Sequence, residues 1–433
     1  MESKANNKYS NLPTGWEMKK LKDVAINCGD YGANAPALPY KAGDIRYIRI
    51  TDIDDYGHLI SDDKASLDET IAQNYLLKDN DILFARTGDT VGKSLLYKSS
   101  MGRAAYAGYL IRFTLDEKQI FPEYFDAIAK SDIFETFKVS MKRIGAKPNI
   151  NSREYGIFRF PMPLNLGEQK EIAKLFSKVD EAIASVQNSI AAAERLKKSL
   201  MQNLLTGKMK PDGTFRTPNE FYIDEKFGKV PVGWEVKKVK DLFFMNQDTL
   251  SNKTDADYKF RYITIEAVNT ESIDFESCPE FSFKESPGRA RRIINDYDIL
   301  ISGVRPNLKA FAIYRKPNSQ NWICSTGFHV LTAKDNVCPQ FFFYQILSSI
   351  GASQFHSWVT GSNYPAIGDS DMRNMLLYTP PYKEQLFINQ KFESISKTQK
   401  AKQEKIAVLE RLKKSLMQNL LTGRTRLFNL NKY

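Results

Sequence analysis

The chain has 433 residues, which is long enough for two or three domains that each bury a hydrophobic core. Hydrophobic residues make up 42% and charged residues 26% of the sequence, values that exclude a disordered chain and a membrane-embedded one. No apolar run approaches the ~18 residues of a membrane span and the N-terminus has no apolar signal core, so we expect a cytoplasmic protein with no membrane partner.

The net charge of +11 is modest for this length, but the basic residues gather in two windows. Residues 138–153 contain five lysines and arginines and no acid, and residues 286–316 contain seven against Asp296 and Asp298. Local patches of this kind suit a polyanion such as double-stranded DNA, because each neutralised phosphate releases counterions. The four cysteines are scattered, without a C-x-x-C pair or a nearby histidine pair, so we expect buried free thiols and no metal site.

The sequence contains a tandem duplication with an offset of about 217 residues. PTGWEMKKLKDV at 13–24 recurs as PVGWEVKKVKDL at 231–242, and DIL at 81–83 recurs at 298–300. ERLKKSLMQNLLTG occurs without change at 194–207 and at 410–423. A repeat of this length indicates two similar units in one chain.

Each repeat begins with mixed strand-like and helical patterns, which predict an α/β head. The strand-like runs are 46–50, 81–85, 94–97 and 110–113 in the first copy, and 261–265, 298–302, 310–314 and 329–331 in the second. Helical patterns cover 122–139 and 339–350. The predicted domains are a first head (1–165), a long helix (166–207), a connector (208–230), a second head (231–382), a second long helix (383–423) and a tail (424–433).

The second part of each repeat is predicted to be one long helix with an apolar stripe. Apolar residues recur every three or four positions from Ile172 to Leu204 and from Ile388 to Leu420, with a polar interruption at 398–405. Asn165, with Glu168 three residues later, resembles a capping box, and a glycine follows each helix. We expect the helices to pack antiparallel as a coiled coil that holds the heads apart. In the alternative, each helix packs on its own head.

Three short motifs resemble enzyme signatures, but none has the context that its chemistry needs. GDTVGKS at 88–94 has only three residues between its glycines, a strand-like segment follows it, and the second copy lacks it, so we predict a hairpin turn and no phosphate-binding loop. TPPY at 379–382 has threonine where amino-methyltransferases have a carbonyl-bearing side chain. The aspartate of a nuclease-like P-D, Asp212, lies in the connector, and the three histidines are isolated. We therefore expect no catalytic residue and no bound cofactor.

The duplicated arrangement resembles one family over essentially the whole chain. P-x-G-W-E-x-K-K at the start of each head and E-R-L-K-K-S-L-M-Q-N-L-L-T-G at the end of each helix are similar to the DNA-specificity subunits of type I restriction–modification systems. The resemblance implies two target recognition domains, 1–165 and 231–382, that each read half of a bipartite, asymmetric DNA site, with the helices as a spacer. It implies a non-catalytic chain. The alternative is a stand-alone bivalent nucleic-acid-binding scaffold without methyltransferase partners.

The resemblance also implies partner subunits that carry the chemistry. Two methyltransferase subunits would modify adenine with S-adenosylmethionine, and restriction/translocase subunits would use ATP and Mg²⁺. A methyltransferase must extrude its target base into a pocket, and the sequence of this chain shows no such pocket motif.

The candidate DNA-contacting residues come from the basic windows and the predicted turns. In the first head they are Arg86, Thr87, Lys93, Tyr106, Arg143, Lys147 and Asn149. In the second head they are Arg289, Arg291, Arg292, Arg305, Asn307, Lys309, Asn363 and Tyr364. Residues 357–368 carry no charge where the first copy has the basic segment 140–151, so we expect the heads to contact DNA differently there.

Overall fold

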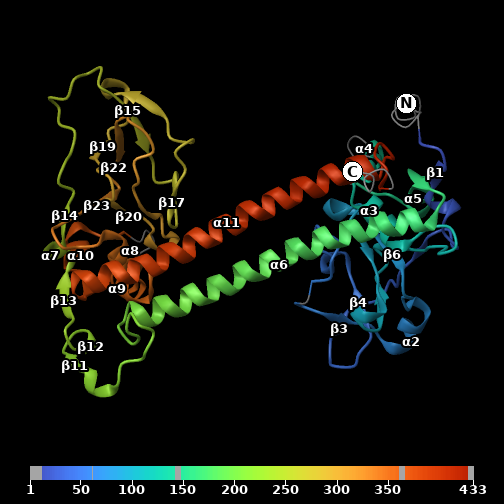
Figure 1. Ribbon diagram of the computed structural model, residues 1–433, viewed down its shortest axis with the longest axis horizontal. Helices are drawn as coiled ribbons and strands as arrows, with labels where there is room; N and C mark the ends of the chain where they lie inside the picture. Colours follow the sequence, from blue (N-terminus) through green and yellow to red (C-terminus); the bar gives the residue numbers. More distant parts are fainter. Residues whose placement is uncertain (1–11, 61, 142–147, 360–365, 428–433) are drawn as a thin grey trace. The chain divides into compact units, whose positions relative to one another are not determined.

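The computed structural model describes residues 12–60, 62–141, 148–359 and 366–427 and divides the chain into two compact units (Figure 1). Unit 1 comprises Met1–Gln187 and Glu404–Tyr433, and unit 2 comprises Asn188–Gln403. Each unit therefore contains one head, the first half of the long helix that follows it and the last half of the other long helix. In the described part of the chain, no helix is long and apolar enough to cross a membrane.

The head of unit 1 contains two four-stranded sheets and a two-stranded one. The first sheet has the order β2 (Asp30–Tyr31), β9 (Leu110–Thr114), β6 (Asp81–Ala85), β7 (Ser94–Leu96). The second has the order β3 (Leu38–Pro39), β5 (Ala65–Ser66), β4 (Arg46–Ile48), β8 (Ala104–Tyr106), with β4 and β8 parallel. The strands β1 (Trp16–Lys20) and β10 (Arg159–Pro163) pair antiparallel at the boundaries of the head. The short helices are α2 (Glu69–Ala72), α3 (Pro122–Ala129), α4 (Asp132–Met141) and α5 (Ser152–Gly156).

The head of unit 2 repeats this plan. Its first sheet has the order β14 (Phe243–Met245), β23 (Phe328–Ala333), β20 (Ile299–Ser302), β21 (Phe311–Ile313). Its second has the order β18 (Glu280–Ser282), β15 (Lys259–Ile263), β22 (Trp322–Ser325), β19 (Ala290–Ile293), again with one parallel pair, β15 and β22. The strands β13 (Glu235–Lys238) and β24 (Leu376–Thr379) take the places of β1 and β10. Further elements are α7 (Val239–Leu242), α8 (Pro339–Leu347), α9 (Ser349–Val359), α10 (Asp369–Asn374) and the hairpins β11 (Phe221–Asp224)–β12 (Gly228–Pro231) and β16 (Val268–Asn269)–β17 (Ser272–Ile273).

The predicted strands are all present within a few residues, and helices cover both helical patterns. Each pattern is two helices, α3 and α4 in unit 1, and α8 and α9 in unit 2. A serine starts the second helix in both cases: Ser131 Oγ accepts from the N–H of Ile133 at 3.2 Å, and Ser348 Oγ accepts from the N–H of Ile350 at 3.1 Å. A side-chain acceptor of this kind satisfies a helix N-terminus and lets the chain turn.

The segment GDTVGKS forms the turn of a β-hairpin, as predicted. The strands β6 and β7 pair antiparallel, with Phe84 opposite Ser94, and the turn between them holds a short 3-10 helix, Gly88–Thr90. The lysine and serine of the motif therefore lead into a strand. A phosphate-binding loop would lead into a helix N-terminus.

The long helices α6 (Leu166–Leu204) and α11 (Tyr382–Leu420), green and red in Figure 1, exchange their ends between the heads. In unit 1, Ile172 and Phe176 of α6 share a hydrophobic core with Trp16 and with Leu420 of α11. The core of unit 2 contains Leu204 and Leu205 with Trp234, and with Ile388 and Phe392 at the start of α11. Each helix thus starts on its own head and ends on the other, which combines the two expected arrangements.

Within each unit the two helix segments run antiparallel. Lys413 Nζ lies 2.6 Å from Asp180 Oδ1 in unit 1, and Lys402 Nζ donates to Ser189 Oγ at 2.5 Å in unit 2. The residues of the predicted apolar stripe are all at least partly buried except Leu196 and Leu412. These two leucines are 53% and 46% exposed and occupy equivalent positions in the two copies. Whether the helices supercoil stays a prediction.

A Glu–Gln pair fixes the start of each long helix, with both glutamines and Glu168 buried and Glu384 half-buried. Gln169 Oε1 accepts from the N–H of Phe121 at 2.7 Å, and its amide donates to the carbonyls of Pro163 and Gln119. In unit 2, Gln385 Oε1 accepts from the N–H of Cys338 at 2.9 Å. These amides satisfy backbone groups that burial would otherwise leave without partners, so they lock each helix to its head.

The glutamates of these pairs bind groups far away in the sequence. Glu168, only 1% exposed, accepts from Trp16 Nε1 at 3.4 Å and from Arg426 at 3.0 and 2.6 Å. In unit 2, Glu384 accepts from Trp234 Nε1 at 3.0 Å and from Arg216 at 2.9 Å. The predicted capping box is therefore only half formed: Asn165 Oδ1 accepts from the N–H groups of residues 167 and 168, but the Glu168 carboxylate binds elsewhere.

We expect Arg426→Ala to destabilise unit 1 by about 1–2 kcal/mol, because it leaves the buried Glu168 carboxylate with one weak donor. The measurement is the free energy of unfolding in urea, followed by circular dichroism. Arg424→Ala, at an exposed site two residues earlier, is the control and should change the free energy little. Equal unfolding curves for the two variants would contradict this role of Arg426.

The aspartate of each D-I-L segment is buried at the start of its strand. Asp81 is 0% exposed and accepts from Thr114 Oγ1 at 2.6 Å, and Asp298 is 2% exposed and accepts from the N–H of Asn295 at 2.7 Å. Burial disfavours the charged form and raises the pKa of both, that of Asp298 to about 6. A carboxyl whose pKa is raised by folding stabilises the fold below its unfolded pKa, and this contribution is lost as the pH rises through the folded pKa.

We therefore expect Asp298→Asn to change how the stability of unit 2 depends on pH. Relative to this variant, the native protein should lose about 1.5 kcal/mol of unfolding free energy between pH 5 and pH 8. The Asp298 carboxyl of the native protein ionises in this pH range, whereas the amide of the variant does not. The measurement is a urea titration at each pH, with exposed Asp335→Asn as the control. A constant difference between the native protein and Asp298→Asn across this pH range would show that Asp298 does not titrate near 6.

Candidate nucleic-acid interface

The turn between β6 and β7 brings predicted residues from two distant segments together. The backbone of Thr87 forms a β-bridge with Asn149, and the N–H of Ile150 donates to the carbonyl of Arg86 at 2.9 Å. A third bond joins the N–H of Gly88 to the carbonyl of Pro148 at 3.0 Å. Arg86, Thr87 and Asn149 therefore lie on one surface, which presents a guanidinium, a hydroxyl and an exposed amide.

Two tyrosines that the sequence did not predict belong to the same surface. The Arg86 guanidinium lies 4.8 Å from the centre of the Tyr31 ring, and Tyr31 Oη accepts from the N–H of Ser152 at 3.2 Å. Tyr109, 59% exposed, accepts the N–H of Arg86 with its carbonyl. Aromatic rings interleaved with cations are typical of surfaces that bind nucleic acids. Tyr31 is 55 positions from Arg86, so no local pattern could have indicated the contact.

Two predicted residues of the first head, Lys93 and Tyr106, do not belong to this surface. Lys93 Nζ lies 2.8 Å from Asp55 Oδ1 and donates to the carbonyl of Ile53, so its charge is already paired. The prediction for Tyr106 was wrong, because its ring is 1% exposed and packs against Tyr75, and burial raises its pKa to about 12. Arg143 and Lys147 lie outside the described residues.

The second head has a matching turn between β20 and β21. The backbone of Val304 forms a β-bridge with Ala366, and the N–H of Ile367 donates to the carbonyl of Gly303 at 2.8 Å. His329 supports the same segment, with Nε2 lying 3.0 Å from the carbonyl of Ile367. The short 3-10 helix Pro306–Leu308 repeats the one in the first turn. The two heads thus share one backbone frame.

The side chains on the second turn differ from those on the first. Arg305 and Asn307 are exposed, whereas Lys309 Nζ donates to the carbonyl of Leu347 at 3.1 Å. Asn363 and Tyr364 lie outside the described residues. The predicted site residues on this turn are thus split between two exposed groups and one that is bound to the head.

Arg289, which precedes β19, and the two arginines of β19 lie near this turn along the backbone. The carbonyl of Arg289 accepts from the N–H of Thr326. The residue after Thr326, Gly327, accepts with its carbonyl from the N–H of Gly303. Arg289 is exposed, the Arg291 guanidinium lies 4.5 Å from the centre of the Phe283 ring, and Arg292 donates to Thr249 Oγ1 at 3.2 Å. Of these three arginines, Arg289 is therefore the most exposed and the one best placed to bind a ligand.

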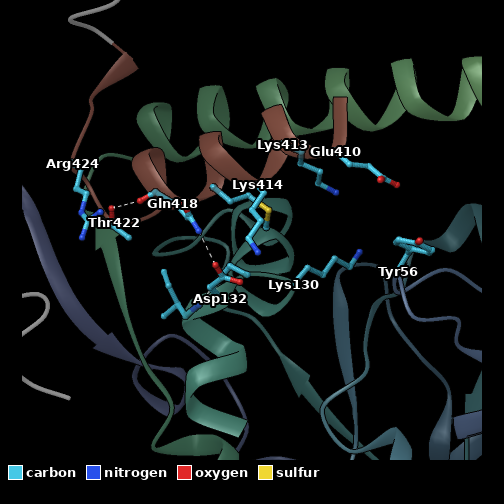
Figure 2. A pocket seen from close by; sticks show the side chains of 12 residues that line it. Tyr56, Lys130, Asp132, Glu410, Lys413, Lys414, Gln418, Thr422 and Arg424 are labelled. Carbon is cyan, nitrogen blue, oxygen red and sulfur yellow. Dashed lines mark hydrogen bonds between the residues drawn. The ribbon is translucent and has the colours of Figure 1, made fainter. Parts of the chain in front are cut away.

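A separate pair of hollows lies where each head meets the end of a long helix. Figure 2 shows the one in unit 1, about 600 Å³, between the α3–α4 junction and the end of α11, where Gln418 donates to Asp132 at 3.0 Å. Unit 2 has an equivalent of about 650 Å³. Five lining residues are the same in the two copies: Glu410, Lys413, Lys414, Met417 and Gln418 in unit 1, and Glu194, Lys197, Lys198, Met201 and Gln202 in unit 2.

Nothing in the described residues forms a metal centre: no three histidine, cysteine, aspartate or glutamate side chains come together there. Among the described cysteines, three are buried and Cys28 is exposed, and all four are free thiols. The expectation of buried thiols was therefore wrong for Cys28.

The family model for the type I restriction modification DNA specificity domain matches the chain twice, at residues 13–195 and 231–411. A relative from Methanocaldococcus jannaschii, the putative type I restriction enzyme MjaX specificity subunit, is 24% identical over 96% of this chain and 95% of its own. The MjaVIII specificity subunit of the same organism is 22% identical over 82% of this chain and 81% of its own.

Two solved structures share the fold. One, from a study of the complex assembly and conformational transition of the type I R-M system, has a TM-score of 0.57 at 16% identity, covering 96% of this chain and 100% of that one. The type I restriction–modification S subunit from M. genitalium has a TM-score of 0.56 at 13% identity, covering 95% and 96%. With the family model matched in both repeats, the chain belongs to the type I restriction–modification DNA specificity subunits, the non-catalytic members that give these complexes their DNA sequence recognition.

Proposed function

We propose that the chain recognises a bipartite, asymmetric DNA site, with one half-site read by each head, and positions adenine methyltransferase subunits on it. The observation that carries this proposal is the matched turn of the two heads. The backbone frame is the same, since Thr87 bridges Asn149 and Val304 bridges Ala366, but the side chains on it differ. A constant frame with different side chains is what two different half-sites require.

The exposed groups suit base edges in the major groove. Guanidinium groups pair with the O6 and N7 acceptors of guanine, and amides pair with adenine. The first turn offers the exposed Asn149 and the half-buried Arg86, and the second offers the exposed Arg305 and Asn307, with the exposed Arg289 on a neighbouring segment. Two domains that bind one face of a duplex place their half-sites about one helical turn, ~10 bp, apart.

The partners would supply the chemistry. Methyl transfer to adenine needs an extruded base and a pocket for it, and we propose that methyltransferase subunits provide both and bind the S-adenosylmethionine. Two copies are supported by the matched hollows of the two units, because five identical residues in the same positions present the same surface twice. Restriction/translocase subunits would use ATP and Mg²⁺.

The purified chain is expected to transfer no methyl group from radiolabelled S-adenosylmethionine to DNA. A methyltransferase that co-purifies with it from native lysate should restore transfer and methylate a bipartite motif. Methyl transfer by the chain alone would contradict the proposed division of labour. Recovery of a DNA-binding chain without any methyltransferase would instead favour the stand-alone scaffold.

Exchange of one head should change one half-site. Replacing residues 24–158 with the matching region of a relative keeps the β1–β10 pair intact and removes the whole first turn. We expect methylome sequencing to show a new first half-site and an unchanged second one. The matched exchange of residues 242–375, inside the β13–β24 pair, should do the reverse. A change in both half-sites from a single exchange would refute the assignment of one half-site to each head.

A further inference from the structure

Four residues in unit 2 hold a left-handed backbone that their side chains disfavour. Among the described residues, eight non-glycine residues have positive φ, and four of these are asparagine or aspartate, which tolerate it. The other four are Glu271 at 66°, Tyr297 at 68°, Arg305 at 48° and Lys309 at 50°. Such a conformation carries a cost for these residues, and strained residues of this kind cluster at functional sites.

For three of the four, a side-chain contact provides the compensation. Glu271 pairs with Lys197 at 2.8 Å, and the Tyr297 ring lies 5.6 Å from the Arg315 guanidinium. Lys309 donates to the carbonyl of Leu347, the last residue of α8, where unpaired carbonyls attract a cation. Arg305 is different: in the described parts of the chain its exposed guanidinium has no hydrogen-bond or ion-pair partner.

The matching turn of the first head shows that the fold does not need an arginine there. By the spacing of the repeat, Gly88 and Gly92 occupy the places of Arg305 and Lys309, and they have φ values of 71° and 83°. Glycine adopts this backbone without strain. The frame is therefore formed without a side chain at this position, and among the described residues no side-chain contact offsets the cost of the arginine in the second head.

We propose that Arg305 reads a guanine in the half-site bound by the second head, an inference that rests on the proposed function. The planar guanidinium matches the O6 and N7 acceptors of guanine with two parallel hydrogen bonds. The backbone of Arg289 is linked to the start of this turn, because its carbonyl accepts from the N–H of Thr326 and the next residue, Gly327, accepts from the N–H of Gly303. Arg289 therefore brings a second exposed cation to this part of the head. The strain at Arg305 is compensated when DNA is bound.

The difference between the heads favours a base over a phosphate as the ligand. Every half-site has the same phosphate backbone, so a phosphate contact at this place in the frame would serve both heads equally. Base sequence differs between half-sites. A side chain that is arginine in one head and absent in the other, on the same backbone, fits the part of DNA that varies.

The test uses the complete methyltransferase complex and the substitution Arg305→Gly. We expect the melting temperature of the chain to be unchanged or raised by up to about 2 °C, because glycine relieves the strain. Methylation of the native motif should fall about ten- to hundred-fold, and the motif should relax at one guanine position of the second half-site. The first half-site is the internal control and should not change.

Two further variants separate the causes. Arg305→Lys keeps the charge but loses the two-pronged donor, and it should relax the same position. Tyr297→Gly, a matched change from a strained residue to glycine that precedes β20 and lies off the turn, should leave the motif unaltered, because it removes only the ring that lies against the Arg315 guanidinium.

Several results would overturn the inference and leave the proposed function standing. One is an Arg305→Gly variant with the native motif and the native methylation rate, and another is a lower melting temperature of that variant. A third is a loss of DNA affinity that is equal for all sequences, with the slope of log affinity against log salt concentration reduced by about one unit, because this indicates a phosphate contact. A native complex that methylates no bipartite motif would instead refute the proposed function itself.

Discussion

The Glu–Gln pair at the start of each long helix is the junction on which both units depend. Its amide satisfies backbone groups of the head, and its carboxylate binds a tryptophan from the start of the head and an arginine from the segment after the other helix. Glu168 and Arg426 are 258 positions apart. A junction with such distant partners stabilises one arrangement of the chain, because a buried carboxylate is costly wherever these donors are missing.

The exchange of helix ends explains why the last fourteen residues of the two repeats are identical while the heads have diverged. The end of each long helix must fit the start of the other head, and the two heads start with the same P-x-G-W sequence. A side chain at Gly207 would collide with Pro231 and Trp234, and one at Gly423 would collide with Pro13 and Trp16. The P-x-G-W segment that starts each head and the L-L-T-G segment that ends each helix are thus two halves of one contact, made twice.

The repeat made most of the fold predictable, because every strand pattern could be checked against its copy. What the sequence could not show was which partners meet across long distances. The apolar spacing placed Leu196 and Leu412 on the apolar stripe of the long helices, yet both are exposed. Periodicity shows which face of a helix is apolar, but it does not show how much of that face is buried. Tyr106 has a side chain that could contact a DNA base, but it lies in the core. The tyrosine that contacts Arg86 is Tyr31, which no local sequence pattern indicated.

The matched turns show how a duplicated fold can acquire two specificities without changing its frame. The bridges of residues 87 and 304 fix where each turn lies, and the 3-10 helix fixes its shape. Only the side chains then need to differ. Where the first head has glycine at residues 88 and 92, the second has Arg305 and Lys309 on the same left-handed backbone. The lysine is bound to the head, whereas the exposed arginine side chain has no hydrogen-bond or ion-pair partner in the part of the chain that the structure describes. Strain concentrated at an exposed cation, on a backbone that glycine fits at no cost, assigns that position to binding and not to folding.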